Sequence, residues 1–333
     1  MLGFGVKAGM LPLHGWLPAA HAKAPAPASA LLSGVIIKTG IYGIVRVLAD
    51  HPSADPLQVV VLTLGLAGAL YGAALALVQS DAKRLLAWSS VSQVGIILAG
   101  IGAGAWGGSL THIAGHASAK AILFLAVGTI VQATGTARLA KLGGLWKAMP
   151  VTFGLSVAAG GVLMGLPILR ASTGKAEIHH ALAGAPIAEG AFFLAAAGTI
   201  AVVLKLLIGV FLGPARVSSR APATMTLAMG IVALPILLPA VPTDIFYFTA
   251  TAGLGGLLYL AARRWSAIEL PVRMPTLPTR IAGIAARRAT LPSPLPPLPI
   301  GRLRAGLHRY TRETGANLAL LFAVLLAAIF LLW

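Results

Sequence analysis

Three ionisable side chains follow one another at four-residue intervals in one apolar stretch of the sequence. His112, His116 and Lys120 belong to the string THIAGHASAK, inside the apolar segment 107–133. On an α-helix this spacing of i, i+4 and i+8 places all three on one face. Ionisable groups inside a membrane span are costly, and such groups by default indicate a functional site. Histidine titrates near neutral pH and relays protons through its ring nitrogens, so the chemistry that this row indicates is proton transfer.

The same row has two other interpretations. Its side chains could form ordinary hydrogen bonds between helices, or the two histidines could bind a metal. A metal site is disfavoured because no third ligand is evident near them. Cysteine is absent from the chain, which excludes thiolate metal sites and iron–sulfur ligation by cysteine. We therefore expect no cofactor and no redox centre in this chain.

The composition is that of a polytopic helical membrane protein. The chain has 333 residues, of which 58% are hydrophobic and 10% charged, whereas a soluble domain has about 25% charged residues. Its apolar runs are unbroken over about 20 residues, the length of a transmembrane helix. An outer-membrane barrel would show shorter segments of alternating polarity instead. The sequence therefore predicts an all-α membrane fold.

We expect about nine transmembrane helices plus a partial helix within 1–24, which is short and interrupted by Pro12 and Pro18. The expected spans are 27–50, 57–79, 85–103, 107–133, 150–183, 190–213, 221–240, 244–262 and 316–333. The fifth span contains Gly165-Leu166-Pro167, and proline removes a backbone donor, so this helix should break there. Broken helices at membrane depth are tolerated where they line a cavity or are buried in protein.

The net charge of +17 is explained by topology rather than by nucleic-acid binding. Lysine and arginine collect in the segments 80–84, 134–149, 214–220 and 263–315, and are absent from the intervening loops 51–56, 104–106, 184–189 and 241–243. The positive-inside rule then places the basic loops in the cytoplasm and the C-terminal Trp333 outside an inner membrane. The sequence divides into a transmembrane domain over 1–262, a basic proline-rich cytoplasmic connector over 263–315 near lipid, and a C-terminal helix over 316–333.

Further polar residues lie in or beside the apolar segments. Lys7, Lys38, Arg170, Lys175 and Lys205 need partners or water there, and Lys205 could pair with Glu189 or extend to the interface. His14 and His21 flank a proline-containing turn, where they could accept protons from the cytoplasm. Asp81, Lys83 and Arg84 fit a helix-capping and topological cluster better than a part of the proton path.

Four blocks of this sequence resemble one known family in the same order, over roughly 1–215. The blocks are KAGMLPLHGWLPAAHAKAPAPASALLSGVIIKTGIYGIVR from Lys7, DAKRLLAWSSVSQVGII at 81–97, HIAGHASAKAILFL at 112–125, and GGLWKAMPVT at 143–152 leading to GLPILRASTGK at 165–175. They are similar to the antiporter-like membrane subunits of respiratory complex I, membrane-bound hydrogenases, formate hydrogenlyase and multi-subunit sodium/proton antiporters. The resemblance implies other membrane subunits as partners.

The resemblance also implies a proton path built from two inverted repeats with broken helices. Lys7 matches the lysine of the broken helix in the first repeat, and Lys38 matches the connecting lysine on the next helix. His112, His116 and Lys120 match the central stripe, and Lys175 matches the lysine after the second break, toward the exit. A unit charge about 10 Å away at an effective dielectric near 20 is worth roughly 1.7 kcal/mol, enough for one lysine to bias the next.

Two features depart from the family pattern. The family has further helices before the point where this sequence begins, one of them carrying a glutamate, and here no acidic residue precedes Asp50. Either this sequence is a truncated or split version that a separate chain with those helices completes, or the first half-channel does not conduct. Arg170 stands in a segment, 168–172, that differs from the family's usual Pro-Phe-Ser-Gly-Phe-like run, and it adds a charge about one turn from Lys175 that Glu177 could compensate.

The sequence thus favours a proton-translocating subunit of a larger complex, of the NADH:quinone oxidoreductase or hydrogenase type. One alternative is a structural or assembly subunit that keeps the fold without conducting. The other is a cation/proton antiporter subunit, which the scarcity of carboxylates disfavours.

Overall fold

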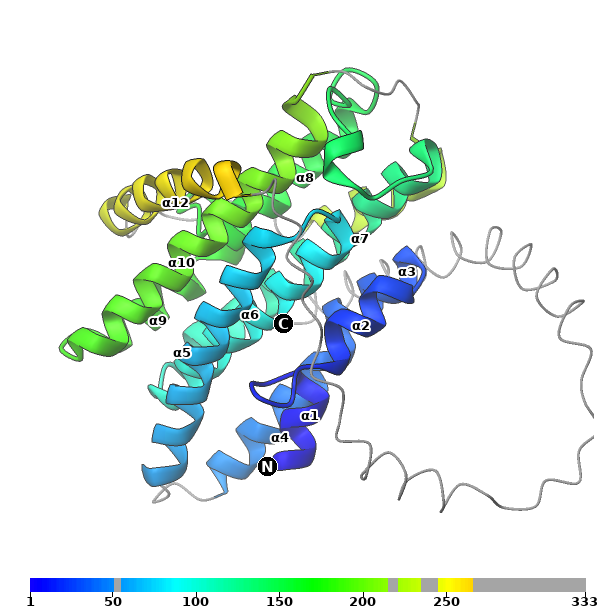
Figure 1. Ribbon diagram of the computed structural model, residues 1–333. Coiled ribbons are helices and arrows are strands. Elements are labelled where there is room, and N and C mark those ends of the chain that lie inside the picture. The colour runs from blue at the N-terminus through cyan, green and yellow to red at the C-terminus, as the bar shows by residue number, and fades with distance from the viewer. Residues whose placement is uncertain (51–54, 215–220, 235–244, 266–333) are drawn as a thin grey trace, which may run out of the picture.

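The computed structural model describes residues 1–50, 55–214, 221–234 and 245–265, and this part of the chain is helical, with a single β-bridge between Asp81 and Arg138 (Figure 1). Five of its helices are long and apolar enough to cross a membrane: Ala26–Ala49, Pro56–Val78, Ala82–Gly102, Trp106–Thr134 and Pro186–Leu212. The fold is therefore an all-helical membrane fold, as expected. The expected helix at 316–333 and nearly all of the connector at 263–315 lie outside the described residues.

The N-terminal region contains a helix pair and then a long span with a π-helical turn. Helix α1 (Leu2–Ala8) ends at Gly9, which has the left-handed φ of 73°, and α2 (Trp16–Lys23) follows after a turn. Helices α3 (Ala26–Leu31) and α4 (Ile37–Ala49) are joined by the π-helix η1 (Leu32–Ile36). Nothing in the local sequence predicted this π turn, and Lys38 is the second residue after it. π turns inside α-helices occur frequently at functional sites.

Helices α5 (Asp55–Val78) and α6 (Ala82–Gly102) pack against each other through glycines. A Cβ atom on Gly95 would lie 2.3 Å from the backbone nitrogen of Ala69, and one on Gly65 would lie 2.5 Å from that of Ala99. Small residues let helix backbones approach closely in a membrane, where packing rather than the hydrophobic effect holds helices together. Asp81 caps α6, because its Oδ1 accepts the Arg84 N–H at 3.0 Å, which confirms the expected capping role.

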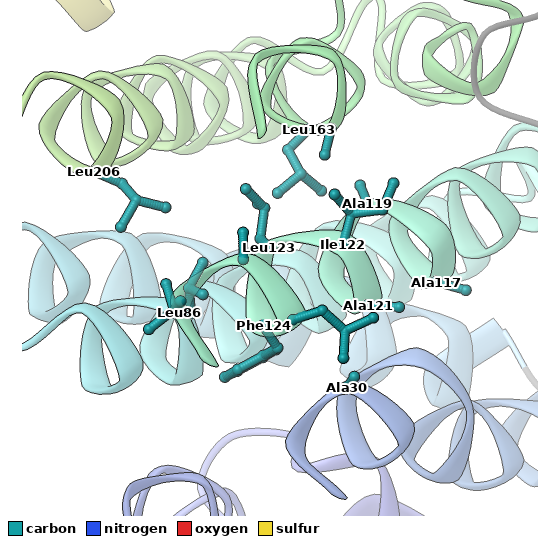
Figure 2. Close-up of a cluster of buried hydrophobic side chains, with 14 of the residues drawn as sticks. Ala30, Leu86, Ala117, Ala119, Ala121, Ile122, Leu123, Phe124, Leu163 and Leu206 are labelled. Carbon is teal, nitrogen blue, oxygen red and sulfur yellow. The ribbon is translucent and has the colours of Figure 1, made fainter. Parts of the chain in front are cut away.

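Helix α7 (Trp106–Thr134) lies at the centre of the bundle and is buried along most of its length. It packs against α3, α6, α8 (Pro150–Met164), α9 (Gly174–Ala181) and the short helix α11 (Ala223–Ala233). Figure 2 shows Ile122, Leu123 and Phe124 of α7 lying among side chains of the surrounding helices, such as Ala30, Leu86, Leu163 and Leu206. This part of α7 is thus enclosed by protein.

The expected break in the fifth span is present. Helix α8 (Pro150–Met164) ends at Gly165, whose φ of 89° is left-handed. The chain then passes through the 3₁₀ turn η3 (Arg170–Ser172) and resumes as α9 (Gly174–Ala181). The hydroxyl of Ser172 donates to the carbonyl of Leu169 at 2.6 Å and to that of Leu166, which adds to the backbone hydrogen bonds that these carbonyls already accept in the turn.

The remaining helices complete the bundle. The 3₁₀ turn η2 (Leu139–Lys141) lies in the connection before α8. Helix α10 (Pro186–Leu207) continues into the π-helix η4 (Ile208–Leu212), and α12 (Ile245–Trp265) packs across α10 (Figure 1). A Cβ on Gly255 would meet the Ala197 carbonyl oxygen at 2.7 Å, so α12 approaches α10 at a glycine.

Candidate functional site

The row predicted on α7 is buried and continuous. His112, His116 and Lys120 are each 0% exposed, and the ring centroids of the two histidines lie 6.2 Å apart. An ammonium and two imidazoles enclosed this completely need polar partners, because a buried polar group without a partner is costly.

The partners of Lys120 come from α6. Its ammonium donates to the carbonyl of Leu86 at 2.9 Å and to the hydroxyl of Ser89. The hydroxyls of Ser89 and Ser90 each donate to the same Leu86 carbonyl at 3.0 Å. This carbonyl therefore accepts from three donors, all of them buried.

The same cluster reaches Lys38 on the other side. The hydroxyls of Ser33 and Ser90 lie 2.9 Å apart, and the ammonium of Lys38 donates to the backbone carbonyl of Ser33 in the π turn. Polar groups of η1 and α6 thus lie between Lys38 and Lys120. The two ammonium groups are also close enough for their charges to interact.

Lys175 joins the row at the break between α8 and α9. It is 1% exposed, and its ammonium donates to the Leu163 carbonyl at 2.5 Å, in the last turn of α8. Cations are favoured at helix C-termini, where carbonyls lack helical partners. The charge of Lys175 acts on both His112 and His116. The charges of Lys38 and Lys120 also act on His116, so more of the lysines act on His116 than on His112.

His112 is held by a hydrogen-bond chain across three helices. Its Nε2 lies 3.0 Å from Gln93 Oε1 of α6, and Gln93 Nε2 donates to Thr199 Oγ1 of α10 at 2.9 Å. The Thr199 hydroxyl donates in turn to the Ala195 carbonyl at 3.1 Å. The chain therefore ends on a backbone group.

His21 and His14 are both buried, in different surroundings. The His21 ring stacks on Phe124 of α7 with centroids 4.5 Å apart and an interplanar angle of 13°, and it lies within the electrostatic reach of Lys120 and Lys38. His14 packs against Tyr71 and Trp88, with centroid distances of 5.4 and 5.5 Å. His21 thus lies beside the row, whereas His14 belongs to an aromatic cluster.

Three sequence-predicted residues are not brought to the row. Lys7, Arg170 and Glu177 are all exposed. Arg170 lies on η3, whereas the ammonium of Lys175 is enclosed and donates to the Leu163 carbonyl. Compensation of the Arg170 charge by Glu177 stays a prediction.

The expectation that Lys205 could pair with Glu189 is wrong. The Lys205 ammonium donates to the Leu77 carbonyl at 2.5 Å, at the C-terminal end of α5, and Glu189 lies 3.3 Å from the ring of His179. The reason is geometric, because the two residues stand near opposite ends of α10 and a helix rises about 1.5 Å per residue.

Several polar residues of the site were not singled out from the sequence. They are Ser33, Ser89, Ser90, Gln93 and Thr199. Ser89 and Gln93 stand at i and i+4 on the buried part of α6, and this spacing is the signal that could have identified them. Within the described residues, no group of three or more histidine, aspartate or glutamate side chains could hold a metal ion.

These features define a class: a multi-pass helical membrane protein with a broken helix and an enclosed row of lysines and histidines. Residues 1–205 match the family described as NADH:quinone oxidoreductase/Mrp antiporter, TM. The chain belongs to this family.

Curated relatives include subunits of different complexes. Formate hydrogenlyase subunit 3 of Escherichia coli is 36% identical over 271 residues, which is 71% of this chain and 44% of that protein. NAD(P)H-quinone oxidoreductase chain 4 1 of a Synechococcus species is 35% identical over 315 residues, 86% of this chain and 58% of the relative. The chain therefore spans about half the length of these relatives.

Solved structures with this fold are also multi-subunit assemblies. A chain of respiratory complex I from Thermus thermophilus superposes with a TM-score of 0.67 at 26% identity, covering 77% of this chain and 57% of that one. A chain of the archaeal membrane-bound sulfane sulfur reductase gives a TM-score of 0.66 at 27% identity, covering 85% and 55%. The protein is thus an antiporter-like membrane subunit of the kind found in such complexes.

Proposed function

We propose that this chain moves protons through a membrane, as one subunit of a complex of the NADH:quinone oxidoreductase or hydrogenase type. The observation that carries the proposal is the enclosed row on α7, where Lys120, His116 and His112 share one face and Lys38 and Lys175 approach from two sides. A merely structural bundle has no need of three lysine side chains, two buried and one half-buried, that act electrostatically on one histidine.

The partners of the lysines suit proton transfer. Lys38, Lys120 and Lys175 all donate to backbone carbonyls, and Lys120 also donates to a hydroxyl. Burial in a low dielectric disfavours the charged form of lysine, and a neutral acceptor does not lock that charge in place as a carboxylate would. Each lysine can therefore release its proton without leaving a buried anion behind.

The row orders these groups into a path. Ser33 and Ser90 lie between Lys38 and Lys120, and His116 lies between Lys120 and the pair formed by His112 and Lys175. A proton that arrives on one group changes the charge seen by the next, worth roughly 1.7 kcal/mol at about 10 Å and an effective dielectric near 20. His21, stacked beside the row, is a group through which cytoplasmic protons would reach Lys120.

The test is proton flux through the assembled complex in proteoliposomes carrying Lys120→Ala. We expect flux to fall to the background of protein-free liposomes, because the row loses its ammonium at the serine cluster. Lys141→Ala, an exposed lysine outside the row, is the matched control and should leave flux unchanged. Unchanged flux in Lys120→Ala at normal assembly would refute the proposal.

Other parts of the proposal concern the surroundings of the chain. We infer that other membrane subunits pack beside it and that the basic loops face the cytoplasm. Lys7 is exposed on α1, and no acidic residue occurs in the first 49 positions, so a partner for Lys7 would have to come from outside this segment.

The second candidate function is a non-conducting structural subunit. The exposed position of Lys7 favours it, because one lysine that the family resemblance placed on the path is not enclosed. Under this alternative the Lys120→Ala complex assembles and pumps normally. Sodium-dependent flux would instead indicate a cation/proton antiporter subunit.

A further inference from the structure

The hydrogen-bond chain from Ala195 to His112 has a defined direction. Thr199 donates its single hydroxyl proton to the Ala195 carbonyl, so its oxygen is an acceptor for Gln93 Nε2. The amide nitrogen of Gln93 therefore faces α10 and its oxygen faces α7. An amide oxygen only accepts, so His112 must donate from Nε2 to Gln93 Oε1.

The opposite orientation of the Gln93 amide makes fewer hydrogen bonds. If the amide were turned over, Thr199 would have to donate to Gln93 and give up Ala195, and Gln93 would then donate to His112. That arrangement contains two side-chain hydrogen bonds, whereas the observed one contains three. The anchor on the Ala195 carbonyl thus selects one amide orientation, and with it one ring nitrogen of His112.

We propose that Gln93 is a positioning residue that holds neutral His112 as its Nε2–H tautomer, which leaves Nδ1 as the atom that takes up and releases the proton. The two nitrogens of histidine are distinct, and the partner of one sets the role of the other. Nδ1 of His112 is buried and has no hydrogen-bond partner within the described residues. This inference deepens the proposed function and rests on it.

This one-sided protonation of His112 differs from a simple relay, in which a proton arrives at one ring nitrogen and leaves from the other. A proton added at Nδ1 gives an imidazolium that still donates from Nε2 to Gln93, so the hydrogen-bond chain is kept in both states. An amide cannot pass the Nε2 proton onward, so the proton must leave from Nδ1 again. His112 therefore takes up and releases its proton at Nδ1 only. The ionisable groups around it are His116 on the same helix, Lys175 of α9 and Lys38 of α4.

The test reads the tautomer directly, by nitrogen NMR of the full chain labelled with ¹⁵N-histidine in lipid bilayers at pH 8. The signal of His112 is identified by its loss in His112→Gln. We expect the wild type to show a protonated Nε2 and an unprotonated Nδ1. A protonated Nδ1 with an unprotonated Nε2 in the wild type would overturn the proposal.

Substitutions test each residue of the hydrogen-bond chain separately. Thr199→Val removes the anchor and should let the amide turn, which shifts His112 toward the Nδ1–H tautomer, whereas Thr199→Ser keeps the hydroxyl and the wild-type signal. Gln93→Leu should give a mixture of tautomers, and Gln93→Glu should retain Nε2–H because a carboxylate also accepts. Ser92→Ala removes a neighbouring buried hydroxyl that bonds to Ala69 instead, and should change nothing. An unchanged tautomer in both Thr199→Val and Gln93→Leu would refute the role of Gln93.

Proton flux through the assembled complex is the second readout. We expect Gln93→Leu to lower flux at least about tenfold, as when groups that orient a functional histidine are lost elsewhere. Ser92→Ala, outside the hydrogen-bond chain, should conduct normally. If Lys120→Ala also conducts normally, the proposed function fails even where the tautomer is as expected. If Lys120→Ala is inactive and Gln93→Leu conducts normally with an altered tautomer, only the role of Gln93 fails.

Discussion

At the scale of single residues, the buried lysines share one type of partner. Lys38, Lys120, Lys175 and Lys205 donate to the backbone carbonyls of Ser33, Leu86, Leu163 and Leu77, respectively. A carbonyl satisfies the ammonium without carrying a charge of its own. Removing the proton from such a lysine therefore leaves no uncompensated anion, unlike the breaking of a buried ion pair. The proposed proton transfer needs lysines of this kind, which are held in position by acceptors that carry no charge.

Exchangeable charge at Lys175 makes Lys175→Arg informative. Arginine keeps the positive charge and the donors but does not lose its proton in proteins. We therefore expect Lys175→Arg to abolish proton flux in proteoliposomes of the complex as completely as Lys175→Ala does. Lys141→Arg, at an exposed position, is the matched control and should conduct normally. Normal flux through Lys175→Arg would mean that Lys175 supplies only a fixed charge.

The sequence predicted the residues of the row that share one helix, but not the contacts between helices. The spacing of His112, His116 and Lys120 determines their common face once a helix is assumed. Ser33 and Ser90 are 57 positions apart, and Gln93 and Thr199 are 106 apart. Such pairs depend on how helices rotate and approach, which local sequence does not encode.

At the scale of elements, glycines set the distance between α5 and α6. Each of Gly65, Gly72, Gly95 and Gly102 has a backbone nitrogen of the facing helix within 2.5 Å of its ideal Cβ position. The pair therefore packs backbone against backbone along much of its length, which places α6 and its serines accurately against α7. The break at Gly165 was predictable because glycine and proline mark it, whereas the π turn in η1 has no such marker.

This close approach predicts that Gly95→Ala is disruptive. Its Cβ would lie 2.3 Å from a backbone nitrogen of α5, so the helices must separate. Overpacking of this kind costs about 1–3 kcal/mol of the free energy of unfolding. Gly154→Ala on α8 is the control, because nothing lies within 4 Å of its Cβ, and it should be neutral or stabilising. Thermal unfolding of the two purified variants in detergent measures the difference, and equal midpoints would contradict close packing here.

At the scale of the whole molecule, the bundle has two distinct ends. The basic turn η2 packs beside η4, at the C-terminal end of α10, and Leu139 donates its N–H to the Ser80 carbonyl of the α5–α6 connection. Ala183 lies just before the N-terminus of α10. The span Pro186–Leu212 thus separates a basic end from an end that carries no lysine or arginine between 182 and 204. Lysine and arginine collect on the cytoplasmic side, so the basic end should face the cytoplasm.

Single cysteines can test this orientation, because the natural chain contains none. We expect Lys141→Cys to react with a membrane-impermeant maleimide only from the cytoplasmic side, and Ala183→Cys only from the opposite side. Both positions are exposed, so labelling reports sidedness rather than access. Ser118→Cys, at a fully buried position on α7, is the control and should react from neither side in intact membranes. Labelling of intact cells and of inverted vesicles distinguishes the sides, and the reverse pattern would invert the direction of the proton path through Lys120 and Lys175.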